Sequence, residues 1–110
     1  MIIQTAWLDR QFAFDQPIGA FPTILERLRG TPARARELVA GIPEYLLAAR
    51  VKGKWSVKEH LGHLIDLQPL DDQRLDEFLK RAEALPAADM ENRATENGKH
   101  RDVPIAEIVE

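Results

Sequence analysis

The sequence contains no cysteine among its 110 residues. Disulfides and thiolate metal ligands are therefore excluded, and any metal site must use histidine, aspartate, glutamate or water. The sequence also lacks an apolar run approaching the roughly 20 residues that cross a bilayer. Its opening, MIIQTAWLDR, has neither the basic start nor the long apolar stretch of a signal peptide. We therefore expect a soluble, cytoplasmic protein that does not bind membranes.

A large excess of charge is missing too, since the formal net charge is -3. The charge is uneven along the chain: residues 1–55 carry 8 basic and 5 acidic side chains, whereas residues 56–110 carry 7 and 13. Nucleic-acid binding requires a concentrated basic face, so the acidic second half argues against it. No G-x-S-x-G, Walker A or H-E-x-x-H motif is present, so the catalytic residues stay unknown.

Helical periodicity begins near Ile18 and continues, with interruptions, to about residue 50. Gly30 is placed to end a first helix, and Thr31 and Pro32 are typical of the N-cap and first position of a second. The segment EYLLAAR after Pro43 predicts a further short helix. The apolar residues at helical spacing in the first two segments are Phe21, Ile24, Leu25, Leu28, Leu38, Val39 and Ile42.

A longer helix is predicted from about Ser56 to about Glu83. Ser56 and Glu59 have the spacing of a capping box, which marks a helix start. The apolar phase is the same before and after Pro69, so we expect the proline to bend the helix without ending it, at a cost of roughly 3 kcal/mol in an isolated helix. The apolar residues that recur on one face of this helix are Val57, Leu61, Leu64, Leu75, Phe78 and Leu79.

Periodicity disappears after Pro86. The segment AADMENRATENGKHRD is polar, so we expect a long loop in which His100 is exposed. Pro104 then begins PIAEIVE, which predicts the first turns of another helix, with little chain left for its apolar face to pack on.

Two histidines of the long helix, His60 and His63, are candidate metal ligands. They are three residues apart, a spacing that can bring two side chains to one metal on a helix. His60 lies nearer the centre of the apolar face and His63 at its edge, and the pattern alone also allows one buried and one surface histidine. We expect the neighbouring Glu59 and Asp66 to be solvated or to orient an imidazole.

The stretch from Trp55, WSVKEHLGHLIDLQPL, resembles the DinB-like (YfiT-like) metalloenzyme superfamily. Members of that family often have W-S-x-x-E-x-x-x-H-L-x-D at this place, and here the sequence has Trp55, Ser56, Glu59, His63 and Asp66. The flanking phrases RLRGTPARARELVAGIP, RLDEFL and LPAADMENRATENGKH are also similar. The resemblance covers roughly residues 7–110.

The resemblance implies an all-α fold, namely part of an up-and-down four-helix bundle with two long helical regions and the start of a third. It also implies a divalent metal of the zinc or nickel type, held by three histidines, and metal-dependent hydrolysis or thiol transfer on a small-molecule substrate. His63 corresponds to the first ligand. The other two belong to an H-x-x-x-H on the last helix, and this sequence contains no such motif.

We therefore expect residues 1–110 to form a single domain that is incomplete at its C-terminal end and inactive alone. Its apolar face should then cause self-association, for instance as a homodimer. The alternative is a helical interaction or dimerisation module without enzymatic activity, in which the two histidines of the long helix are interior polar residues.

Overall fold

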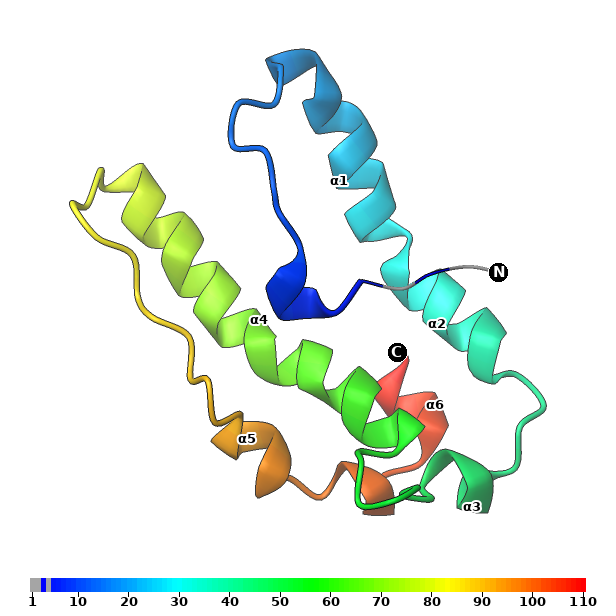
Figure 1. Ribbon diagram of the computed structural model, residues 1–110. Coiled ribbons are helices and arrows are strands. Elements are labelled where there is room, and N and C mark those ends of the chain that lie inside the picture. Colours follow the sequence, from blue (N-terminus) through cyan, green and yellow to red (C-terminus); the bar gives the residue numbers. More distant parts are fainter. Residues whose placement is uncertain (1–2, 4) are drawn as a thin grey trace. The chain divides into compact units, whose positions relative to one another are not determined.

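The computed structural model describes residue 3 and residues 5–110 (Figure 1). These residues form helices and connecting segments without a β-strand, apart from an isolated bridge between Val51 and Lys54. The prediction of an all-α fold is confirmed, whereas a four-helix bundle stays a prediction. The chain divides into two compact units, Met1–Thr31 and Pro32–Glu110. A single domain over the whole chain also stays a prediction, and we describe each unit by itself.

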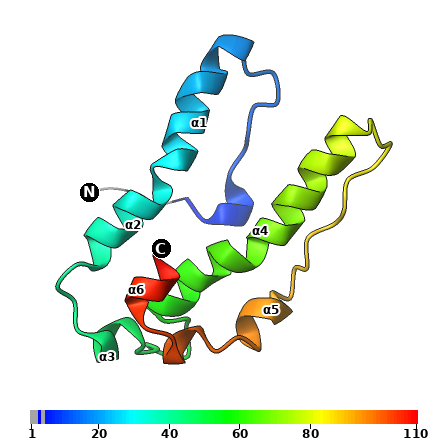
Figure 2. The same ribbon diagram turned by 180° about the vertical axis from the view of Figure 1, so that it is seen from behind.

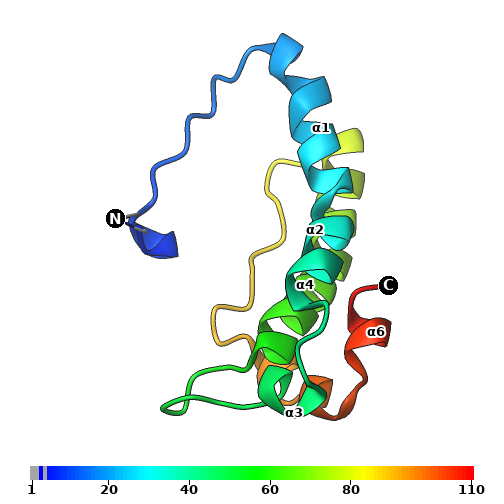
Figure 3. The ribbon, with the colours of Figure 1, turned by 90° about the vertical axis from the view of Figure 1, so that its right-hand side faces the viewer.

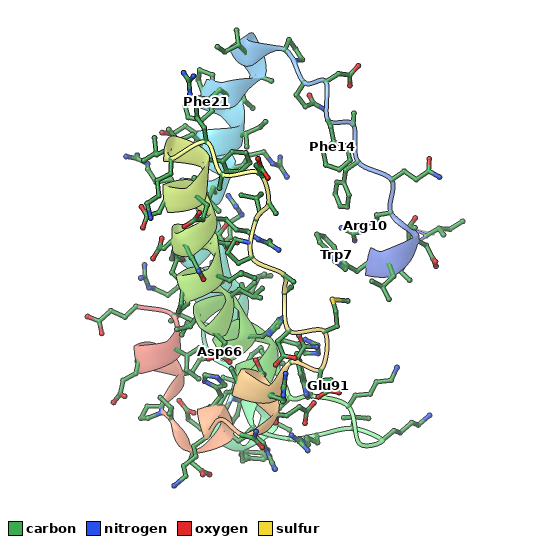
Figure 4. All side chains as sticks on the ribbon, turned by 90° about the vertical axis from the view of Figure 1, so that its left-hand side faces the viewer. Trp7, Arg10, Phe14, Phe21, Asp66 and Glu91 are labelled. Carbon is green, nitrogen blue, oxygen red and sulfur yellow. The ribbon has the colours of Figure 1, made fainter. Side chains whose placement is uncertain are left out.

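The first unit contains two 3-10 turns, η1 (Trp7–Asp9) and η2 (Ile18–Ala20), and helix α1 (Phe21–Arg29). Gly30 caps α1 as predicted, since its backbone N–H bonds to the carbonyls of the last turn. Before α1, the guanidinium of Arg10 lies 5.4 Å from the centre of the Trp7 ring (Figure 4). This spacing is within the range of a cation–π contact.

The second unit contains the remaining helices. In chain order they are α2 (Thr31–Val39), α3 (Glu44–Leu47), α4 (Val57–Leu79), α5 (Arg93–Glu96), η3 (His100–Asp102) and α6 (Ile105–Ile108). Thr31 is already helical, one residue earlier than predicted, and its hydroxyl donates to the carbonyl of Arg27 at 3.2 Å. The predicted short helix after Pro43 is confirmed as α3.

Helix α4 begins with the predicted capping box. The Ser56 hydroxyl accepts from the backbone N–H of Glu59, and the Glu59 carboxylate accepts from the backbone N–H of Ser56. The helix continues through Pro69, as the apolar phase predicted, and ends at Leu79 rather than near Glu83. A bend at Pro69 stays a prediction. No helix in the described residues is long and apolar enough to cross a bilayer.

After α4 the chain turns back along the helix, and α5, η3 and α6 pack against it (Figures 1 and 2). The segment that leads to α5 lies on one side of α4 and α6 on the other (Figure 3). The expectation of one long loop here is wrong, because α5 and η3 interrupt it. In the turn before α5 the Asp89 carboxylate accepts from the backbone N–H groups of Glu91 and Arg93.

A small apolar core joins α6 to the helices that precede α4. Val39, Leu47 and Val109 are buried together, with Leu61 of α4 packed against them. The C-terminal apolar residues therefore do have a packing partner, contrary to expectation.

The predicted apolar face of α4 is mostly exposed. Its exposed members are Val57 (43%), Leu64 (50%), Leu75 (62%), Phe78 (65%) and Leu79 (84%). The buried residues of α4 are instead Lys58, Glu59 and Gly62. The physical reason is that segments before and after α4 supply polar partners on the other face, Arg50 to Glu59 and Val103 to Lys58.

Candidate functional site

Four polar side chains from three elements meet beside the first half of α4. His63 and Asp66 lie on α4, Thr95 on α5 and His100 on η3. Figure 4 shows Asp66 on α4 beside α5. We call these four residues the imidazole cluster.

Asp66 is the centre of the imidazole cluster. Its Oδ2 accepts from the Thr95 hydroxyl at 2.6 Å and lies 2.8 Å from His100 Nε2. Burial raises the pKa of Asp66, but the hydrogen bonds from Thr95 and His100 and the nearby imidazoles outweigh burial and keep this pKa below its ordinary value. The carboxylate is therefore ionised at neutral pH and can only accept hydrogen bonds.

His63 is attached to this carboxylate through Thr95. Its Nδ1 lies 2.9 Å from the Thr95 hydroxyl oxygen. Its Nε2 has no hydrogen-bond partner among residues 3 and 5–110. Thr95 itself is only 1% exposed, so its single hydroxyl is shielded from bulk solvent. One imidazole nitrogen of His63 is thus held by the protein and the other is available.

His100 is the member that the sequence analysis missed. Its side chain is 16% exposed, so the prediction of an exposed histidine is wrong. It is accommodated by Gly62, because a Cβ at that position would lie 2.3 Å from His100 Cγ. The only signal in the sequence was a glycine inside a helix, which is often explained by a close approach of another group.

Lys58 holds the segment around η3 against α4. This lysine is 4% exposed, and its ammonium donates to the carbonyl of Val103 at 2.6 Å and pairs with Glu44. The Glu44 carboxylate also accepts from the backbone N–H of Ile105 at 2.9 Å. A buried charge with these partners fixes the chain on both sides of α6's start, and so the position of His100.

Glu59 was expected to be solvated or to orient an imidazole, and it does neither. It is 3% exposed and forms an ion pair with Arg50, whose Nε lies 3.0 Å from both carboxylate oxygens. The Arg50 hydrogen bonds outweigh burial and lower the pKa of Glu59 to about 2. Its role is to fix the start of α4, because the same carboxylate completes the capping box.

His60, the other candidate of the pair, is exposed. It contacts the Trp55 ring with a centroid distance of 5.5 Å, and His63 contacts the same ring at 5.1 Å. The Trp55 Nε1–H donates to the Glu96 carboxylate at 2.6 Å, which ties the ring to α5. The structure therefore places His63, and not His60, in a polar network.

A pocket of about 300 Å³ lies next to the imidazole cluster. His63, Asp66 and Thr95 contribute its polar wall, while Leu67, Pro69 and Leu70 of α4 contribute apolar surface. Its size and mixed lining are typical of small-ligand sites.

The donor set of the imidazole cluster suits one metal–imidazole bond rather than a complete metal site. The available Nε2 of His63 is a suitable donor, and its Nδ1 is held by the Thr95 hydroxyl, which in turn is hydrogen-bonded to the Asp66 carboxylate. Within residues 3 and 5–110, no three or more histidine, aspartate or glutamate side chains are grouped to hold a metal ion.

Comparisons with protein-family models, curated proteins and solved structures found no match for this chain.

Proposed function

We propose that this chain is a DinB-like helical protein in which His63 binds a divalent metal through Nε2. Two observations support the proposal: the W-S-x-x-E-x-x-x-H-L-x-D signature and the hydrogen bond that occupies His63 Nδ1. The hydrogen bond carries the argument, because it leaves Nε2 as the donor nitrogen and separates His63 from the exposed His60.

The proposed reaction class is metal-dependent hydrolysis or thiol transfer on a small molecule held in the adjacent pocket. A catalytic zinc-type site uses about three protein ligands and an open position. The imidazole cluster supplies one, so the remaining ligands must come from outside the described residues. We therefore expect no turnover from the isolated monomer.

Metal titration of the full chain tests the proposal, with His60→Ala as the matched control. Calorimetric titration with Zn²⁺ and with Ni²⁺ should show binding that His63→Ala removes and His60→Ala leaves unchanged. His60 is a fair control because it lies on the same helix against the same tryptophan. Equal loss in both variants, or no binding by the unsubstituted chain, would contradict the proposal.

A second candidate function is a helical dimerisation module without enzymatic activity. The observation that favours it is the exposure of Leu75, Phe78 and Leu79 at the end of α4. Sedimentation at micromolar concentration distinguishes the oligomeric states. A compact, stable monomer would exclude this function.

A further inference from the structure

In the imidazole cluster, the hydrogen-bond geometry determines which group donates and which accepts in each hydrogen bond. The Thr95 hydroxyl oxygen lies between His63 Nδ1 at 2.9 Å and Asp66 Oδ2 at 2.6 Å. A threonine hydroxyl has one proton to donate. The position of that proton decides which nitrogen of His63 is protonated.

The proton of Thr95 must lie toward Asp66. Two oxygens 2.6 Å apart, one of them a charged carboxylate, attract each other only if a proton lies between them. Asp66 cannot supply it while ionised, so Thr95 donates and its oxygen is free to accept. His63 Nδ1 is then the donor to Thr95.

The same reasoning applied to His100 places the proton on Nε2, whereas in His63 it lies on Nδ1. His100 Nε2 lies 2.8 Å from Asp66 Oδ2, which can only accept, so Nε2 must carry the proton. His60 has no side-chain hydrogen bond within the described part of the chain, so no hydrogen bond there selects one of its tautomers.

We infer that Thr95 and Asp66 are positioning residues that fix His63 as its Nδ1–H tautomer, while Asp66 fixes His100 as the Nε2–H tautomer. His63 then presents the lone pair of Nε2. The use of this lone pair as a metal ligand rests on the proposed function, but the tautomers themselves do not. A neutral imidazole in solution exchanges between both forms, so a fixed tautomer removes that exchange before any ligand arrives.

Nitrogen-15 spectroscopy of the metal-free chain, labelled at histidine, tests the inference directly. Spectra are recorded well above the ordinary imidazole pKa of about 6.5. His63 should show a protonated Nδ1, His100 a protonated Nε2, and His60 the averaged shifts of a mixture. A His63 ring protonated at Nε2, or averaged like His60, would overturn the inference.

Thr95→Val and Thr95→Ser separate positioning from packing. Valine keeps the shape of threonine but has no hydroxyl to accept from His63 Nδ1. His63 should therefore become a mixture of tautomers, while His100 stays protonated at Nε2. Serine should restore the His63 tautomer. An unchanged His63 tautomer in a folded Thr95→Val chain would overturn the role of Thr95, and the unsubstituted chain decides the inference if that variant does not fold.

These experiments test metal binding and the His63 tautomer independently. A correct tautomer without metal binding would refute only the proposed function. A wrong tautomer would refute the inference whether or not metal binds.

Discussion

The two halves of α4 differ in what the fold buries. The first half contains all three buried residues of the helix, Lys58, Glu59 and Gly62, and the second half contains none. The second half exposes Leu75 and Phe78 by 62% and 65%. Burial in this helix therefore follows the supply of hydrogen-bond and ion-pair partners from the segments before and after α4, and apolar character alone does not determine it.

Glu59→Gln should produce the largest effect. A pKa of about 2 against an ordinary 4.5 corresponds to about 3 kcal/mol of stability at neutral pH. Glutamine retains an oxygen for the capping box but not the charge that pairs with Arg50. Urea unfolding at pH 7 should therefore show a loss of about 3 kcal/mol.

The stability contribution of Glu59 should also depend on pH in a definite direction. Because the pKa of Glu59 is lower in the folded chain, its contribution is complete above about pH 4.5 and is lost as the pH falls toward 2. The difference in free energy of unfolding between the unsubstituted chain and the Glu59→Gln variant should shrink over that pH range. Glu77→Gln is the matched control in the second half, where the carboxylate is 28% exposed and 3.5 Å from Lys80. It should change stability by less than about 0.5 kcal/mol, and a loss equal to that of Glu59→Gln would remove the contrast between the halves.

Gly62→Ala should have an intermediate effect. Its Cβ would overlap His100, so the ring must leave Asp66, at a cost of about 1–3 kcal/mol. In a His100→Ala background the same change should instead stabilise by up to about 1 kcal/mol, since alanine favours helix more than glycine does. Thermal unfolding of the unsubstituted chain, the two single variants and the double variant measures this. If Gly62→Ala still destabilises the chain without His100, the overlap with His100 is not the cause.

Phe78→Ser should have the smallest effect on the folding of the monomer. An exposed side chain contributes little, so the free energy of unfolding should change by less than about 0.5 kcal/mol. The same variant should weaken any self-association measured by sedimentation. A large loss of stability at a concentration where the chain is monomeric would mean that this half of α4 is packed as firmly as the first.

Local features were predictable from the sequence, and long-range partners were not. The capping box of Ser56 and Glu59 acts over three residues, and the continuation through Pro69 follows from a shared phase on both sides. Thr95 and His100 lie about one third of the chain from His63 and Asp66, and their contacts depend on where α5 and η3 return. Periodicity located the apolar residues of α4 correctly but could not say which face the returning chain would cover.

His63 was singled out only by the family resemblance, because the pattern favoured His60 for burial. In the structure His63 differs from His60 in having a side-chain hydrogen bond, on Nδ1; its role as a metal ligand stays a prediction. Glu59 was misjudged because its partner Arg50 lies in the connection between α3 and α4, and helical periodicity does not predict the side-chain contacts of such a segment.

The most direct test of the central claim is the nitrogen-15 spectrum of the histidine-labelled chain during addition of Zn²⁺. The account predicts that Nε2 of His63 shifts first, while His60 and the Asp66-bound Nε2 of His100 keep their metal-free positions. A shift of His60 with His63 unmoved would contradict the assignment of His63 as the metal ligand.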